Sequence, residues 1–376
     1  MKTYITALFL LLSGSIFAWS PIDEPTALSN GQATTLLSDG DRYVLGQPDS
    51  GYAGEVLVLE PGEPYPVSRL TPENTNYGSQ FGWRLALDQD TLAVSERRPG
   101  TAPIVRVYER TAEDWLQAAF FGDPMGASNN YLFGQSLAIA GDLIFVGRPL
   151  ILNATGSVVV FGKTDGQQAW AQLGTIYAFD SAAHDRFGNA LAASGNQLAV
   201  IAPGHLSEGG EGALYIFTVT REGHQLTQKI TSGQRDLRFS QVAMSEDTLA
   251  VGISGSETVN IYTREQGRWT LSQQLHPDDT SGTNSQFGWS LAIRGNTLCV
   301  AAPFANNMTG ATYVFERFAG IWAKTSRLAP TTNTVSGTCS IGRDTLAVTH
   351  LPSHSPGMVK YYRNPGRLFY NGFESE

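Results

Sequence analysis

The histidines of this sequence are its best candidates for metal binding or nucleophilic catalysis. His350 and His354 flank Leu351-Pro352-Ser353, a spacing that would suit a metal pair or a serine activated by histidine. The proline between them disfavours the helical turn that would bring both side chains to one face, and no third ligand lies near in sequence. We therefore place both histidines in a surface loop.

Other catalytic signatures are missing from the sequence. It contains no Gly-x-Ser-x-Gly, no His-Glu-x-x-His and no phosphate-binding loop. The formal net charge is -9, only 16% of the residues are charged, and the basic residues are scattered, so nothing marks a nucleic-acid surface. We expect a protein that is not an enzyme, has no cofactor or metal site and does not bind nucleic acid.

A short phrase that recurs seven times determines the architecture. It consists of Asp or Asn followed by four mostly apolar residues, and its copies lie 48 to 54 residues apart. The copies start at Asp41, Asp90, Asp142, Asn196, Asp247, Asn296 and Asp344. One supersecondary unit is therefore repeated, and such a unit buries its apolar face only against its neighbours.

Each repeat has the pattern of four short strands. An apolar run enters a tight turn such as Gly141-Asp142 and continues into the recurring phrase, which indicates a hairpin. A third run ends on an aromatic residue, and in four repeats a fourth run begins near a tryptophan. Without a helical period between them, these runs predict an all-β fold: a seven-bladed β-propeller of four-stranded antiparallel blades over residues 32–366.

A Phe-Gly pair precedes the hairpin in most repeats. The phenylalanines are Phe81, Phe133, Phe187 and Phe287, with Phe239-Ser240 in the fifth repeat, whereas Gln32-Ala33 and Ser336-Gly337 replace the pair in the first and last repeats. This pattern resembles the FG-GAP repeat, the unit of the seven-bladed propeller of integrin α subunits, and more closely its compact version in exported bacterial proteins. We expect the phenylalanines to pack between adjacent blades and the glycines to allow close backbone approach.

The resemblance also reveals a difference in metal binding. In the integrin version the first hairpin turn is enlarged into a calcium loop with alternating aspartates, whereas the turns here are short. Asp39-Gly-Asp41 and Asp88-Gln-Asp90 could be remnants of such a loop, but two carboxylates do not supply the six to eight oxygen ligands that calcium prefers. We interpret them as turn residues.

The two cysteines, Cys299 and Cys339, fall in the sixth and seventh repeats, on blades that should be neighbours. An exported protein permits a disulfide, but strand packing sets the distance between the sulfurs. The sequence leaves the pairing open, and buried free thiols are the simpler interpretation.

The two ends of the sequence carry further expectations. Residues 1–18 contain Lys2, an apolar core and small residues up to Ala18, the layout of a secretory signal peptide. No stretch is long enough for a stable membrane span after signal removal, so we expect a secreted, periplasmic or cell-surface protein. Residues 19–31 would add an outer strand that closes the ring or be disordered, and residues 367–376 would form a last strand or a tail.

The loops are the expected binding surface. Since strand directions alternate, the loops that follow the hairpins and the loops that precede Phe-Gly should emerge on one side of the ring, which we call the loop face. Its candidate ligand-binding residues are Tyr52, Tyr77, Tyr131, His205, Phe304 and Asn306. Aromatic and amide side chains of this kind suit a protein or sugar partner.

Three functions stay open at this point. The resemblance implies a non-catalytic protein-interaction or adhesion module with an unknown protein or glycan ligand. A carbohydrate-binding propeller is the alternative. A hydrolase with carboxylates at the propeller channel is a third hypothesis, because carboxylates contributed by distant segments would leave no sequence motif.

Overall fold

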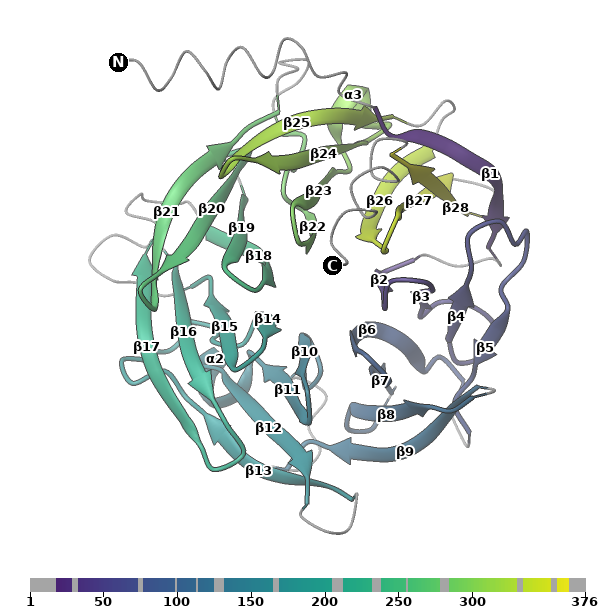
Figure 1. Ribbon diagram of the computed structural model, residues 1–376. Helices are drawn as coiled ribbons and strands as arrows, with labels where there is room; N and C mark the ends of the chain where they lie inside the picture. Colours follow the sequence, from purple (N-terminus) through teal and green to yellow (C-terminus); the bar gives the residue numbers. More distant parts are fainter. Residues whose placement is uncertain are drawn as a thin grey trace, which may run out of the picture.

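The chain forms a closed ring of seven β-sheets (Figure 1). The computed structural model describes residues 18–28, 33–73, 77–98, 100–112, 114–124, 132–164, 169–204, 212–231, 238–254, 256–277, 284–329, 334–352 and 357–364. Each sheet has four antiparallel strands, and the innermost strands of consecutive sheets touch around the whole ring, including the first and the last. The prediction of a seven-bladed propeller of four-stranded blades is confirmed.

The blades follow one another along the chain, each from its innermost to its outermost strand. Blade 1 comprises β2 (Thr35–Ser38), β3 (Tyr43–Gln47), β4 (Glu55–Leu59) and β5 (Ser68–Leu70); blade 2 comprises β6 (Gln80–Asp88), β7 (Thr91–Arg97), β8 (Ile104–Arg110) and β9 (Trp115–Gly122); blade 3 comprises β10 (Leu137–Ala140), β11 (Leu143–Arg148), β12 (Ser157–Lys163) and β13 (Trp170–Ile176). Blade 4 comprises β14 (Ala190–Ser194), β15 (Gln197–Ala202), β16 (Ala213–Val219) and β17 (His224–Thr231); blade 5 comprises β18 (Arg238–Ser245), β19 (Thr248–Ser254), β20 (Thr258–Glu265) and β21 (Arg268–Leu275). Blade 6 comprises β22 (Ser290–Arg294), β23 (Thr297–Ala302), β24 (Ala311–Phe318) and β25 (Ile321–Leu328); blade 7 comprises β26 (Thr334–Ile341), β27 (Thr345–Pro352), β28 (Met358–Arg363) and, on its outer edge, β1 (Ser20–Ala27). Two single-turn helices, α2 (Ile151–Ala154) and α3 (Ala305–Met308), lie in the loops after β11 and β23.

The recurring phrase forms the second strand of each blade. In β3, β11, β15 and β23 every residue is buried. A strand whose sheet packs against a neighbour on both faces has no solvent-exposed side, so it is apolar along its whole length instead of alternating. This explains why the phrase reads as a continuous apolar run.

The Phe-Gly pairs pack between blades, as predicted. Phe81, Phe133, Phe187 and Phe287 are at most 2% exposed. Phe187 belongs to an apolar cluster that joins residues of blades 3 and 4. The glycines that follow these phenylalanines adopt positive φ, and a Cβ on Gly82 would lie 2.6 Å from the carbonyl oxygen of Glu55 in blade 1. Glycine is therefore required there by both conformation and space.

Blade 5 shows why serine can replace this glycine. Phe239 lies opposite Ile253, and Val242 lies opposite Val251, so these two positions on β18 are three residues apart in sequence. In blade 2 the equivalent separation, from Phe81 to Leu85, is four residues. The shorter strand needs no left-handed residue, and Ser240 has a negative φ. The side chain of Phe239 lies outside the described part of the structure.

The N-terminal segment closes the ring. β1 pairs antiparallel with β28, and Trp19 N donates a hydrogen bond to Ser326 Oγ in blade 6 at 3.0 Å. Figure 1 shows β1, in purple, beside the yellow strands of the last blade. Within residues 19–31, the strand comprises Ser20–Ala27, and residues 29–31 lie outside the described residues. β1 occupies the outer edge of blade 7, and residues 367–376 lie outside the described residues.

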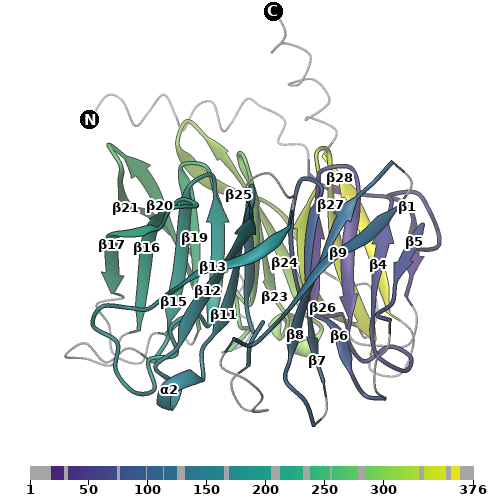
Figure 2. The ribbon, with the colours of Figure 1, turned by 90° about the horizontal axis from the view of Figure 1, so that it is seen from below.

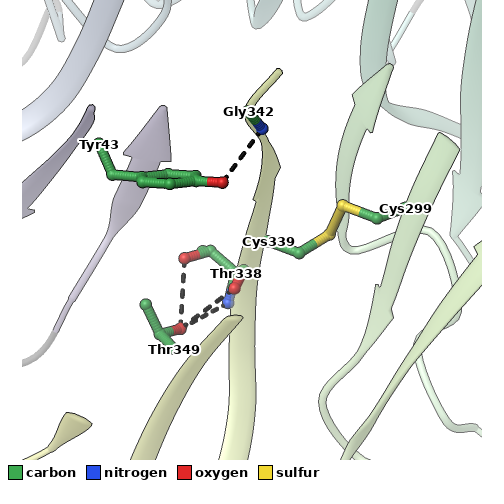
Figure 3. Close-up of a disulfide and its surroundings, with 6 residues drawn as sticks. All are labelled: Tyr43, Cys299, Thr338, Cys339, Gly342 and Thr349. Carbon is green, nitrogen blue, oxygen red and sulfur yellow. Dashed lines mark hydrogen bonds between the residues drawn. A yellow bond between two sulfur atoms is a disulfide. The ribbon is translucent and has the colours of Figure 1, made fainter. Parts of the chain in front are cut away.

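A disulfide joins blades 6 and 7. Cys299 in β23 and Cys339 in β26 are bonded, with their Cα atoms 6.5 Å apart (Figure 3). The interpretation of these cysteines as free thiols is therefore wrong. The physical reason is that β26 packs directly on β23, which brings the two Cα atoms within bonding range. Close to the disulfide, Thr338 N donates to Thr349 Oγ1 at 2.8 Å, which ties the inner strand of blade 7 to its neighbour.

Candidate functional site

Two sets of loops meet on one face of the ring, as the strand directions predicted. The loop after a blade's second strand is hydrogen-bonded to the loop that enters the next blade: Phe81 N donates to Ala53 O at 2.9 Å, and Phe187 N donates to Thr155 O at 2.9 Å. In the side view of Figure 2, α2 marks this loop face at the bottom. Neighbouring blades therefore build the surface jointly, and its backbone is held by hydrogen bonds.

Tyr52 and Tyr77 form an exposed aromatic pair on the loop face. They come from the β3–β4 loop and from the loop between blades 1 and 2, and their ring centroids lie 5.2 Å apart in an edge-to-face arrangement. Gly78 N donates to Tyr52 O at 3.0 Å, which fixes the two loops together. The side chains are 61% and 75% exposed. The structure thus brings together two of the six candidate residues.

The other candidates do not join this pair. Phe304 lies just before α3 in blade 6, is 39% exposed, and lines the mouth of the central channel. Asn306 lies in α3, but its side chain lies outside the described part of the structure. Tyr131 and His205 are also outside the described residues.

The central channel forms a cavity among the described residues. It has a volume of about 980 Å³ and is lined by the inner strands of all seven blades. On the loop-face side each blade contributes the residue that follows Phe-Gly or the pair in its place; these residues are Thr34, Trp83, Gln135, Asn189, Gln241, Trp289 and Thr338. We call them the channel ring. It presents hydroxyls, amides and two indoles, a set able to make both hydrogen bonds and stacking contacts.

The channel ring was missed by the motif search because its members share no residue type. Their common feature is position: each stands directly after the Phe-Gly pair or its replacement.

The two tryptophans of the channel ring differ in how far they are exposed. Arg97 covers Trp83, with its Cζ 3.5 Å from the ring centroid, whereas Trp289 is 55% exposed.

A second cavity, of about 630 Å³, lies at the outer junction of blades 4 and 5. Gln228, one of its lining residues, joins the two blades: its amide donates to Trp269 O at 2.7 Å and accepts from Trp269 N at 2.9 Å. Because the side-chain amide of Gln228 is already bonded to the backbone of Trp269 in the next blade, we assign this cavity a packing role.

Of the aspartates considered as calcium remnants, Asp39 caps its own turn and Asp88 connects its turn to the next blade. Asp39 Oδ1 accepts hydrogen bonds from the backbone N–H groups of Asp41 and Arg42 at 3.0 and 2.8 Å, and Asp88 Oδ2 accepts one from Gly141 N in the next blade at 2.7 Å. Within the described residues, no group of three or more His, Cys, Asp or Glu side chains could hold a metal ion.

His350 does not lie in a loop, so that prediction is wrong. Strand β27 continues past the recurring phrase to Pro352, and His350 pairs with Ser336 on one side and Met358 on the other. Its side chain is 1% exposed, and neither ring nitrogen has a hydrogen-bond partner among the described residues. Burial, with a smaller contribution from Lys360, lowers the pKa of His350 to about 4. His354 lies outside the described residues.

This buried histidine should make the protein less stable in acid. An unfolded chain binds a proton at His350 near pH 6.5, whereas the folded protein resists protonation until about pH 4. The free energy of unfolding should therefore fall by about 3 kcal/mol as the pH drops from 6.5 to 4, on top of other titrations. Urea unfolding of the wild type and of His350→Leu at several pH values measures how much His350 contributes to this loss of stability. An equally steep pH dependence in the variant would contradict it.

Comparison with known families gives one match. A family model described as FG-GAP repeat matches residues 170–217 and 269–315. Each match runs from the outermost strand of one blade through the third strand of the next, and each contains a Phe-Gly pair, at Phe187 and at Phe287. No curated protein matches the sequence. Among the described residues, no helix has the length and apolar character needed to cross a membrane.

Proposed function

Because this chain belongs to the FG-GAP β-propeller family, we propose that it is a non-catalytic module that binds a protein partner through its loop face. The strands are committed to packing between blades, so binding falls to the loops. A rigid ring that displays loops from seven blades offers a wide surface without ordering a flexible chain on binding, which favours affinity.

The observation that carries this proposal is the Tyr52–Tyr77 pair. Two large aromatic side chains remain mostly exposed although a hydrogen bond between their loops already fixes their backbones. Tyrosines presented in this way lose little conformational entropy on binding, and aromatic anchors often dominate the energy of an interface. Phe304 adds a third exposed aromatic group at the channel mouth on the same face.

Replacing Tyr52, Tyr77 and Phe304 together with serine should leave the fold intact and weaken partner binding by at least about 2 kcal/mol, or roughly 30-fold. The partner would be identified by cross-linking in the native cells, and the dissociation constant measured by calorimetry. The matched control replaces Tyr65, which is 71% exposed in the β4–β5 turn, and Phe318, which is 47% exposed at the end of β24. Equal binding by the triple variant and the control would refute the loop-face proposal.

A carbohydrate-binding propeller is the second candidate function. It is favoured by the channel mouth, where the exposed indole of Trp289 lies among the amides of Gln241 and Gln286. Sugars commonly stack a ring face on an indole while amides bond their hydroxyls. A glycan array decides between the two candidates. The described residues that line the channel include no aspartate or glutamate.

We also propose that the protein is exported and acts outside the cytoplasm as an interaction or adhesion module. The layout of residues 1–18 supports export, although residues 1–17 lie outside the described part. The Cys299–Cys339 disulfide supports it too, since such bonds persist in oxidising compartments. Mass spectrometry of the mature N-terminus would test cleavage after Ala18.

A further inference from the structure

Two arginines lie near the indole of Trp83 at the channel mouth, and neither has an acidic partner among the described residues. Arg84 lines the channel next to Trp83, and Arg97 stacks over the indole of Trp83. Arg84 Nη1 donates to Trp83 O at 3.1 Å, and Arg97 Nη2 donates to Gln135 Oε1 at 3.0 Å. Among the described residues, neither guanidinium forms an ion pair with a carboxylate.

Two buried arginines elsewhere in the structure each form an ion pair with a carboxylate. Arg106 is paired with Glu96 at 2.7 Å, and Arg148 is paired with Asp123 at 2.6 Å. Glu96 is the residue before Arg97, yet its carboxylate is directed to Arg98 and Arg106. These two buried arginines therefore each have a carboxylate partner, whereas the half-buried Arg84 and Arg97 have none among the described residues.

The electrostatic environment favours an incoming anion. Burial, with a smaller contribution from the charge of Arg97, lowers the pKa of Arg84 to about 10. A partly desolvated guanidinium beside a second one is unfavourable unless a negative charge neutralises them. Each guanidinium has five N–H donors, of which the contacts above use one, so several donors remain for a ligand at the channel mouth.

We propose that Arg84 and Arg97 form a binding site for a carboxylate group at the mouth of the channel. A carboxylate suits two guanidinium groups because its two oxygens accept paired hydrogen bonds from their planar forks. The amide of Gln135 and the indoles of the channel ring surround the site and would contact the uncharged remainder of the ligand. The carboxylate could come from an acidic amino-acid side chain or from a sugar acid, and this inference holds for either kind of partner.

Matched small probes test the site and distinguish the two sources. N-acetylglutamate N-methylamide is compared with its glutamine counterpart, and methyl galacturonide with methyl galactoside, by calorimetry at constant ionic strength. At least one acidic probe should bind saturably below about 10 mM and at least about tenfold more tightly than its neutral counterpart. Binding of the glutamate probe would identify an acidic amino-acid side chain as the source of the carboxylate, and binding of the galacturonide would identify a sugar acid.

Two variants connect this binding to the arginines. Arg84→Gln combined with Arg97→Gln should weaken the acidic probe at least about tenfold, whereas Arg186→Gln should not change it. Arg186 is exposed in the loop before Phe187, so it controls for net charge. If the double variant does not fold, as judged by circular dichroism, Arg97→Lys keeps the charge but removes the planar fork and should still weaken binding. Equal binding of acidic and neutral probes, no saturable binding, or unchanged binding in the folded variants would overturn the proposal.

Discussion

Replacing Phe187 with alanine should lower the free energy of unfolding by about 3–5 kcal/mol. The side chain is fully buried, and its ring packs edge-to-face on Tyr215 and Phe217, with centroids 5.3 and 6.1 Å away. Since these partners and the surrounding cluster belong to strands of blades 3 and 4, a cavity here would loosen the contact between two blades. Urea unfolding followed by tryptophan fluorescence measures the loss.

Two further variants make this test specific. Phe179→Ala removes a ring that is 75% exposed in the same loop, and it should change stability by less than about 0.5 kcal/mol. Phe287 repeats the environment of Phe187, with Tyr313 and Phe315 at 5.3 and 6.3 Å, so Phe287→Ala should cost about as much. Similar small losses at Phe187 and Phe179 would show that the repeated phenylalanine does not hold the blades together.

Removing the disulfide should destabilise the fold by about 4 kcal/mol. The bond links residues 40 apart in sequence, and closing a loop of this length lowers the entropy of the unfolded chain by about that amount. Replacing Cys299 and Cys339 together with alanine also removes two buried sulfurs from the contact between blades 6 and 7. Thermal and urea unfolding of the double variant measure the combined loss.

Reduction provides the control for this experiment. A reducing agent should destabilise the wild-type protein but leave the double variant unchanged, because only the wild type has a bond to break. Alkylation followed by mass spectrometry reports the state of the thiols directly. If both thiols of the purified protein are alkylated without prior reduction, the bond is not formed in solution.

The features that could be predicted from sequence are those that each repeat encodes locally. The recurring phrase and the Phe-Gly pair reappear at constant offsets, and a pattern copied seven times gives the strand order and the buried faces of a propeller. The structure confirms these features where the side chains are described, including the burial of Phe81 and Phe133. The position of the loop face could also be predicted, because it depends only on the alternating direction of the strands.

The features that could not be predicted arise between blades. The distance between Cys299 and Cys339 depends on how β23 packs on β26, and no local pattern records it. The amide of Gln273 bonds the backbone of Trp322 in the next blade at 2.7 and 2.9 Å, repeating the contact of Gln228 with Trp269. Such contacts join residues 40 to 50 positions apart, so only the folded ring shows that a surface glutamine connects two blades.

The candidate site was predicted in part for similar reasons. Aromatic residues in loops suggested Tyr52 and Tyr77, but their contact depends on a hydrogen bond between two blades. His350 was misplaced because β27 extends four residues beyond the recurring phrase, and no sequence pattern marks this extension. Arg84 and Arg97 belong to different strands, and their meeting over Trp83 depends on side-chain direction.

The pairing of β1 with β28 also determines how the ring responds to mechanical force. Ser20 lies opposite Arg363 and Ala27 lies opposite Met358, so the first residue of β1 and the last residue of β28 leave the sheet at the same end. Pulling these two residues apart loads the residue pairs one after another, from Ser20 and Arg363 onward, instead of loading all of them together. The ring should therefore unzip at this seam under low force, whereas the disulfide limits extension between Cys299 and Cys339.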